Sequence, residues 1–107
     1  MLFKRKKQNY KKEKVIVSFT QKLGMVCIRS LEEYIEKNKI IKCYIVTASS
    51  PHTNVINYAK NIDLIEIVIS SDFRQEIEKI KKLYQDSIIE IINLEDFGEK
   101  NVMRDAI

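Results

Sequence analysis

The sequence has little glycine and little proline, and this scarcity excludes a common kind of site. Gly24, Gly98 and Pro51 are the only residues of these two types in 107 positions. Phosphate-binding loops need clustered glycines, because backbone amides must approach the phosphates closely. Nucleotide binding through a glycine-rich loop is therefore disfavoured. The chain also offers no flexible linker, so we expect a single domain.

Histidine and cysteine are equally scarce. The chain holds one histidine, His52, and two cysteines, Cys27 and Cys43, which form no CxxC pair. A structural zinc site needs about four such ligands, so none can be assembled here. Serine hydrolysis would depend on His52 as its base, and no GxSxG motif is present. We expect two buried thiols, no catalytic residue, no metal and no cofactor.

No apolar run approaches the length of a membrane span. Apolar runs, such as the pairs of isoleucines on either side of Glu90, are at most four residues long, whereas a spanning helix needs about 20 apolar residues. The basic N-terminus is not followed by the apolar stretch of a secretory signal. Apolar residues make up 45% of the chain and charged residues 32%, a balance typical of globular proteins. We therefore expect a soluble intracellular protein.

What the chain does have is positive charge concentrated at its N-terminus. Residues 1–14 hold seven basic residues and one acid, a net charge of +6, which leaves −2 for the rest of a chain whose net charge is +4. We interpret residues 1–13 as a flexible basic arm and residues 14–107 as an α/β domain. The arm could neutralise phosphates, or be a solvated tail or a targeting signal. The candidate nucleic-acid contacts are Lys4, Arg5, Lys6, Lys7, Lys11, Lys12 and Lys14.

Residue patterns predict four strands separated by three helices. β-branched and aromatic residues favour strands at 15–19, 41–47, 64–69 and 88–92. Between them, apolar residues recur every three or four positions, as amphipathic helices require. This β-α-β-α-β-α-β order predicts one α/β domain with a mostly parallel four-stranded sheet flanked by helices. Residues 94–107 are expected to form a loop with a short helix.

Capping residues predict where the helices start and stop. Gly24 would open the first helix and Asn38 would end it, while Asp72 would cap the third. For the second helix, Ser50 would be the cap and Pro51 the first helical residue.

The start of the second helix is also a candidate binding site. A helix N-terminus presents unpaired amides and a partial positive charge, and nearby hydroxyls add donors. Such a segment could hold a phosphate or an acidic side chain of a partner. The alternative is that Ser-Pro is only a folding signal and the histidine a polar first-turn residue. The residues concerned are Ser49, Ser50, His52 and Thr53.

Several stretches resemble the N-terminal jaw domain of the fifth common subunit of eukaryotic RNA polymerases. Residues 22–29 (KLGMVCIR) are similar to the family's turn that opens a helix, and residues 40–46 (IIKCYIV) to its following buried strand. A looser similarity continues through residues 88–97 (IIEIINLEDF). The chain lacks a counterpart of the family's long N-terminal helical region and of its small assembly domain.

The resemblance implies a restriction-endonuclease-like fold and a non-catalytic role in transcription. The chain would be a component of a DNA-dependent RNA polymerase that packs against the largest subunit and other polymerase subunits. It would lie near downstream duplex DNA, with no small-molecule substrate and no membrane. It would act in the nucleus if the source is eukaryotic and in the cytoplasm otherwise.

The same stretches resemble nucleases of the Mrr type, which hold a divalent metal through an aspartate on one strand and a Glu/Gln-x-Lys motif on the next. Ser18 and Thr20 stand at the Glu/Gln and Lys positions, and residues 1–62 contain no aspartate. We therefore expect no metal site of this kind. Two alternatives stay open. One is a diverged nuclease with a relocated acid, Asp63 or Glu66, and the other is a free-standing nucleic-acid- or protein-binding module.

Overall fold

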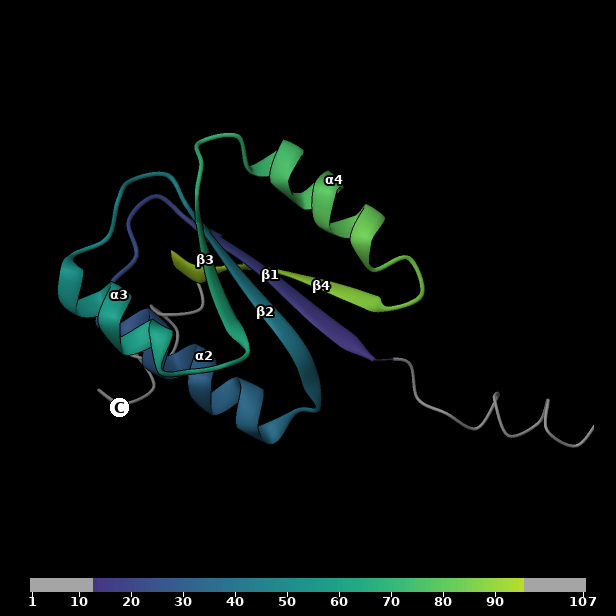
Figure 1. The fold of residues 1–107 in the computed structure, drawn as a ribbon, viewed down its shortest axis with the longest axis horizontal. Helices are drawn as coiled ribbons and strands as arrows, with labels where there is room; N and C mark the ends of the chain where they lie inside the picture. The colour runs from purple at the N-terminus through teal and green to yellow at the C-terminus, as the bar shows by residue number, and fades with distance from the viewer. Residues whose placement is uncertain (1–12, 96–107) are drawn as a thin grey trace, which may run out of the picture.

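In the computed structural model, residues 13–95 are the described part of the chain, and they form a four-stranded sheet with helices on both faces (Figure 1). The strands coincide with the segments rich in β-branched residues, as their pleated packing favours. Their ends lie within one residue of the predicted ones. The strands are β1 (Lys14–Thr20), β2 (Ile40–Thr47), β3 (Ile65–Ile69) and β4 (Ile88–Asn93). The helices are α2 (Met25–Lys37), α3 (Thr53–Lys60) and α4 (Phe73–Leu83).

All four strands run parallel, in the spatial order β3-β2-β1-β4. The predicted α/β class, element order and parallel sheet are therefore confirmed. The chain steps from β1 to β2 to β3 in one direction, and then returns across the sheet to place β4 on the other side of β1. This reversal makes the sheet doubly wound, with β1 at the point where the strand order changes direction.

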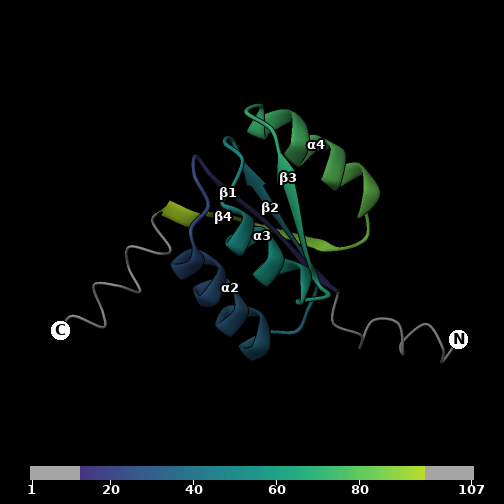
Figure 2. The ribbon, with the colours of Figure 1, turned by 60° about the vertical axis from the view of Figure 1, so that its left-hand side comes forward.

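The two faces of the sheet are covered unequally. Figures 1 and 2 show α2 and α3 together on one face and α4 on the other. On the first face, Ile16 and Ile45 pack in a cluster with Leu31 of α2 and Val55 of α3. On the second face, Val17 and its neighbours pack against α4. Alternating side chains of the central strand thus serve two separate cores, as a sheet buried on both sides requires.

Two of the three predicted helix starts are confirmed. Gly24 precedes α2, and the Asp72 side chain accepts a hydrogen bond from the amide of Gln75 at 3.1 Å. Asn38 ends α2, also as predicted.

The prediction for α3 is wrong, because the helix begins two residues later than Pro51. Its cap is His52, whose Nδ1 accepts a hydrogen bond from the amide of Asn54 at 3.1 Å. The delay has a physical cause at Ser49, whose amide donates to the carbonyl of Gln21 beyond β1. That bond holds the chain in a loop across the sheet edge before the helix can start.

The cysteines differ in burial. Cys43 is fully buried, and burial raises the pKa of its thiol to about 12. Cys27 is only half-buried, and its sulfur lies 3.8 Å from the carbonyl oxygen of Leu94. The prediction of two buried thiols is thus confirmed for Cys43 alone. Residues 94–95 begin a helical turn, whereas the rest of the predicted C-terminal loop and residues 1–12 of the arm lie outside the described residues. Within residues 13–95, no helix has the length and apolar character of a bilayer span.

Candidate functional site

The carboxyl ends of the strands are the first place to look for a site. In doubly wound sheets, ligands bind beyond these ends, at the point where the strand order reverses. Here that point lies between β1 and β4, and polar residues follow both strands.

At the carboxyl ends of the strands, the polar groups form hydrogen bonds with one another. The hydroxyl of Ser49 donates to the carbonyl of Gln21 at 2.6 Å, and the amide of Gln21 donates to Oε2 of Glu95 at 3.0 Å. The amide of Glu95 in turn donates to Oδ1 of Asn93 at 3.1 Å. The loops after β1, β2 and β4 are thereby joined to one another. The Glu95 carboxylate at the centre of this edge also disfavours an anionic ligand.

The residues predicted to bind an anion or a partner lie together where the loop after β2 enters α3, but two of them have structural partners. Ser49 bonds Gln21, and the His52 ring occupies the Asn54 amide that an anion at this helix would need. Ser50 is exposed in the loop, and Thr53 is exposed as the first residue of α3. Ser49 and His52 therefore have roles in the fold, Ser49 in joining two loops and His52 in capping α3.

The positions that would carry the nuclease motif are internal. Ser18 is fully buried, and its hydroxyl donates to the carbonyl of Tyr44 at 3.0 Å. Thr20 is also buried, and its hydroxyl donates to the carbonyl of Lys22 at 3.3 Å. Both hydroxyls therefore hold the backbone and face no open site.

The two candidate relocated acids lie elsewhere in the fold. Glu66 forms an ion pair with Lys42 of the neighbouring strand at 3.2 Å, and Asp63 lies in the turn ahead of β3. Among residues 13–95, no three His, Cys, Asp or Glu side chains are grouped so that they could hold a metal ion.

The opposite end of the sheet, where the strands begin, has a different character. An open groove of about 980 Å³ lies between the end of α2 and the starts of β1, β2 and β4. Three lysines, one glutamate and an amide line it together with isoleucines, and the chain enters β1 here from the basic segment. The lining residues are Glu13, Lys14, Lys37, Asn38, Lys39, Ile40, Ile41 and Ile88.

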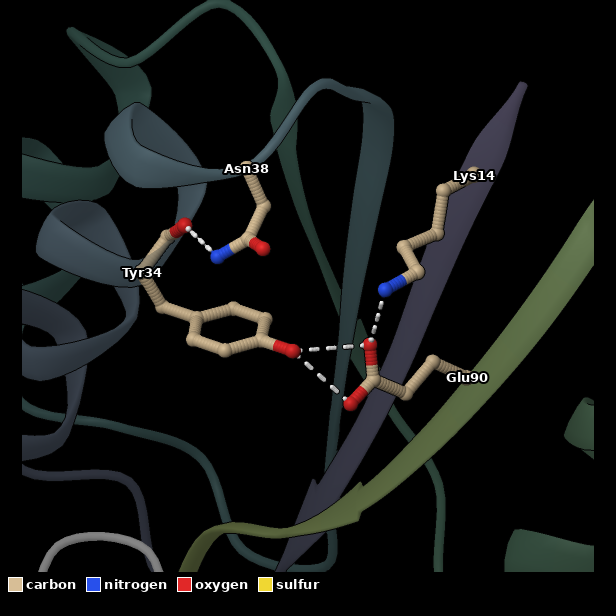
Figure 3. Close-up of polar contacts among 4 residues, drawn as sticks. All are labelled: Lys14, Tyr34, Asn38 and Glu90. Carbon is tan, nitrogen blue, oxygen red and sulfur yellow. Dashed lines mark hydrogen bonds and ion pairs between the residues drawn. The ribbon is translucent and has the colours of Figure 1, made fainter. Parts of the chain in front are cut away.

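A polar cluster fixes one wall of this groove (Figure 3). Nζ of Lys14 lies 3.0 Å from Oε1 of Glu90, and the hydroxyl of Tyr34 donates to both carboxylate oxygens at 3.0 and 2.9 Å. The side-chain amide of Asn38 donates to the carbonyl of Tyr34 at 2.8 Å, which closes the last turn of α2. One carboxylate therefore connects β4 to both β1 and α2.

The cluster perturbs the ionisation of its members in one direction. The hydrogen bond and the charge of Glu90 raise the pKa of Lys14. Burial, followed by the hydrogen bond to Glu90, raises the pKa of Tyr34. Lys14 thus stays cationic and Tyr34 stays neutral well above neutral pH. Because the Lys14 and Glu90 side chains are about one-third exposed, solvent weakens their attraction.

The structure changes the predicted set of basic residues. Lys14 is the first residue of β1 and is held by Glu90, so it is less free to bind a phosphate than the sequence indicates. The other six cations, at positions 4–12, lie outside the described residues. The groove brings in two that the sequence reasoning missed, Lys37 and Lys39, both exposed. Their position between a predicted helix and a predicted strand could have revealed them, since strands of a parallel sheet all begin at one end.

No family model, no curated protein and no solved structure matches this chain. The resemblance to the polymerase jaw domain, the restriction-endonuclease-like fold and the Mrr-type alternative therefore stay predictions.

Proposed function

We propose that the chain is a non-catalytic module that binds duplex DNA through the basic end of its sheet. The observation that carries the proposal is the placement of Lys37 and Lys39 on the groove where the segment with six further cations joins β1. Basic residues gathered from separate parts of a chain on one surface are the electrostatic footprint of a phosphate-binding protein.

The charge balance of the body supports this location. Residues 13–95 contain 11 basic and 12 acidic residues, so the body as a whole would not attract a polyanion. Any attraction to DNA must therefore come from a local excess of positive charge, and the basic end of the sheet has such an excess. At the carboxyl ends of the strands, the negative charge of Glu95 would instead repel DNA phosphates.

A role in binding without catalysis agrees with the way Ser18 and Thr20 use their hydroxyl groups. Ser18 and Thr20 hold the backbone together, and the loops beyond the strands bond to one another. Such a body is a rigid support for surface lysines. In this proposal the chemistry is electrostatic, through release of counterions from DNA.

The polymerase role predicted from the resemblance is a specific form of this proposal. A jaw-like module would flank downstream duplex DNA and pack against the largest subunit of a DNA-dependent RNA polymerase. A free-standing DNA-binding module is the other form. Isolation of the tagged chain from its native cell separates the two, because only the first form co-purifies with the large polymerase subunits.

The binding itself is tested with a fluorescent duplex of random sequence and the full chain. The first variant replaces Lys4, Arg5, Lys6, Lys7, Lys11 and Lys12 with glutamine, and the second carries Lys37→Gln and Lys39→Gln. The matched control, Lys81→Gln with Lys82→Gln, removes the same charge from α4 as the second variant removes from the groove.

We expect both test variants to bind more weakly and the control to bind like the parent chain. For every phosphate that a variant no longer neutralises, the slope of log K against log salt should become shallower by about 0.9. Equally weak binding by the control would show that net charge alone matters. Unchanged affinity in both test variants would contradict DNA binding at this end.

A further inference from the structure

The strand β3 forms one outer side of the sheet and has an unpaired edge within the described part of the chain. The carbonyl of Leu64 and the amide of Ser70 bond to β2, at 2.9 and 3.0 Å. Because peptide groups alternate in direction along a strand, Ile65, Ile67 and Ile69 turn theirs away from β2. This edge therefore presents peptide groups to a further strand.

The outward groups of β3 form a specific pattern. The amide of Ile65 already donates to the carbonyl of Ile62 in the preceding turn, at 3.0 Å. Two outward amides, those of Ile67 and Ile69, are left as donors along the strand, together with the outward carbonyls, including that of Ile65.

An apolar groove runs beside this edge. It has a volume of about 300 Å³ between β3 and α3, with Lys60 and Glu66 at its rim. Ile69, which lines it, is 54% exposed although it belongs to a strand. The apolar lining residues are Ile56, Ala59, Ile65, Ile67 and Ile69. An extended segment that paired with β3 could cover this groove with alternate apolar side chains.

We propose that the occupant of this edge is β3 of a second copy of the chain, paired antiparallel about a two-fold axis at Ile67. In this register the amide of Ile67 donates to the carbonyl of Ile67 in the other copy, and the amide of Ile69 donates to the carbonyl of Ile65. Both outward donors thus meet acceptors, and the one amide left without a new acceptor, that of Ile65, already has its partner. The edge is self-complementary, as an isologous interface requires.

The charges fit the same register. Glu66 is the only charged residue of β3. It lies directly opposite Val68 of the other copy, and its diagonal neighbour, Glu66 of the other copy, is neutralised like itself by Lys42 of its own chain at 3.2 Å. Lys60 lies at the end of α3 that leads into β3, and Asp72 follows the other end of β3. Because the antiparallel arrangement exchanges the two ends, it brings Lys60 of each copy to the end that carries Asp72 of the other.

The pairing is short, so we expect a weak dimer that forms as concentration rises. Sedimentation equilibrium of the full chain over roughly 10 to 500 μM measures its Kd. Ile69→Lys places a charge in the apolar groove and should weaken the dimer at least tenfold. The matched control is Ile91→Lys on β4, the other outer strand, where Ile91 is 45% exposed. It should leave the Kd unchanged.

Amide hydrogen exchange provides a second measurement that does not depend on a substitution. Ile67 and Ile69 should become more protected as the concentration rises, while Ile91 should not. A chain that stays monomeric over the whole range would overturn the proposal. So would a dimer that survives Ile69→Lys but is lost in Ile91→Lys, because that result would assign pairing to β4.

Discussion

Glu90 and Tyr34 meet across the point where the strand order of the sheet reverses. The tyrosine hydroxyl of α2 donates to both carboxylate oxygens of the β4 residue, at 3.0 and 2.9 Å. This contact fastens the helix that follows β1 to the strand that arrives last in the sequence. It also keeps the carboxylate in place beside Lys14, on the wall of the basic groove.

Replacement of Tyr34 by phenylalanine should lower the free energy of unfolding by about 1 kcal/mol. The change removes a hydrogen bond to a charged acceptor in a partly buried place and leaves the ring in position. Urea denaturation measures the loss. In a double-mutant cycle with Glu90→Gln, the two effects should be coupled. Strictly additive effects would mean that the contact contributes nothing to stability.

Ser18 should behave as a structural residue. Ser18→Ala leaves the shape of the core nearly unchanged but removes the bond to the Tyr44 carbonyl, so we expect a loss of about 1 kcal/mol. Ser18→Asp should cost several kcal/mol, because it buries a charge at a fully enclosed position. DNA affinity of the folded Ser18→Ala variant should equal that of the parent chain. A loss of affinity without a loss of stability would assign this hydroxyl a direct role in binding.

Stability should fall as the pH rises through the alkaline range. The pKa of Cys43 is raised from 9.0 to about 12 by burial, so the folded protein keeps a proton that the unfolded chain loses. The stabilisation is present in full below pH 9 and decreases by about 1 kcal/mol per pH unit between pH 9 and 12. The raised pKa values of Tyr34, Tyr44 and Tyr58 act in the same direction above pH 10.

Urea unfolding at a series of pH values from 8 to 11 measures this dependence. The variant Cys43→Val, which fills a similar volume without an ionisable group, should lose most of the part that begins near pH 9 and keep the smaller part due to Cys27, whose pKa burial also raises. The tyrosine contribution should persist in it. An identical pH profile in the variant and the parent chain would contradict the assignment to Cys43.

The element order and the parallel sheet followed from the sequence because they depend on repeated local patterns. A short run of β-branched residues, or a stripe that includes Leu31 and Ile35, identifies a strand or a helix without any knowledge of the partner. The start of α3 could not be obtained in this way. It depends on the bond between Ser49 and Gln21, residues 28 positions apart that only the paired strands bring together.

The basic groove was missed for a related reason. Charge counted along the chain singles out the N-terminal segment, whereas Lys37 and Lys39 stand among acids and apolar residues in the sequence. They join Lys14 only when β1 and β2 lie side by side, with Lys14 beside Ile40. The pairing of β1 with β4 on its other side shows why Lys14 is bound by Glu90, a residue whose nearness no linear pattern indicates.

The central position of β1 has a consequence for synthesis on the ribosome. β1 precedes both of its neighbours in the sequence, and its second neighbour, β4, ends at Asn93. Until that residue leaves the exit tunnel, the edge of β1 that pairs with β4 keeps its peptide groups unpaired. A chain arrested before residue 88 would therefore carry an unpaired strand edge that promotes aggregation. The need for chaperones should be greatest for chains arrested after β1 has emerged and before β4 is complete.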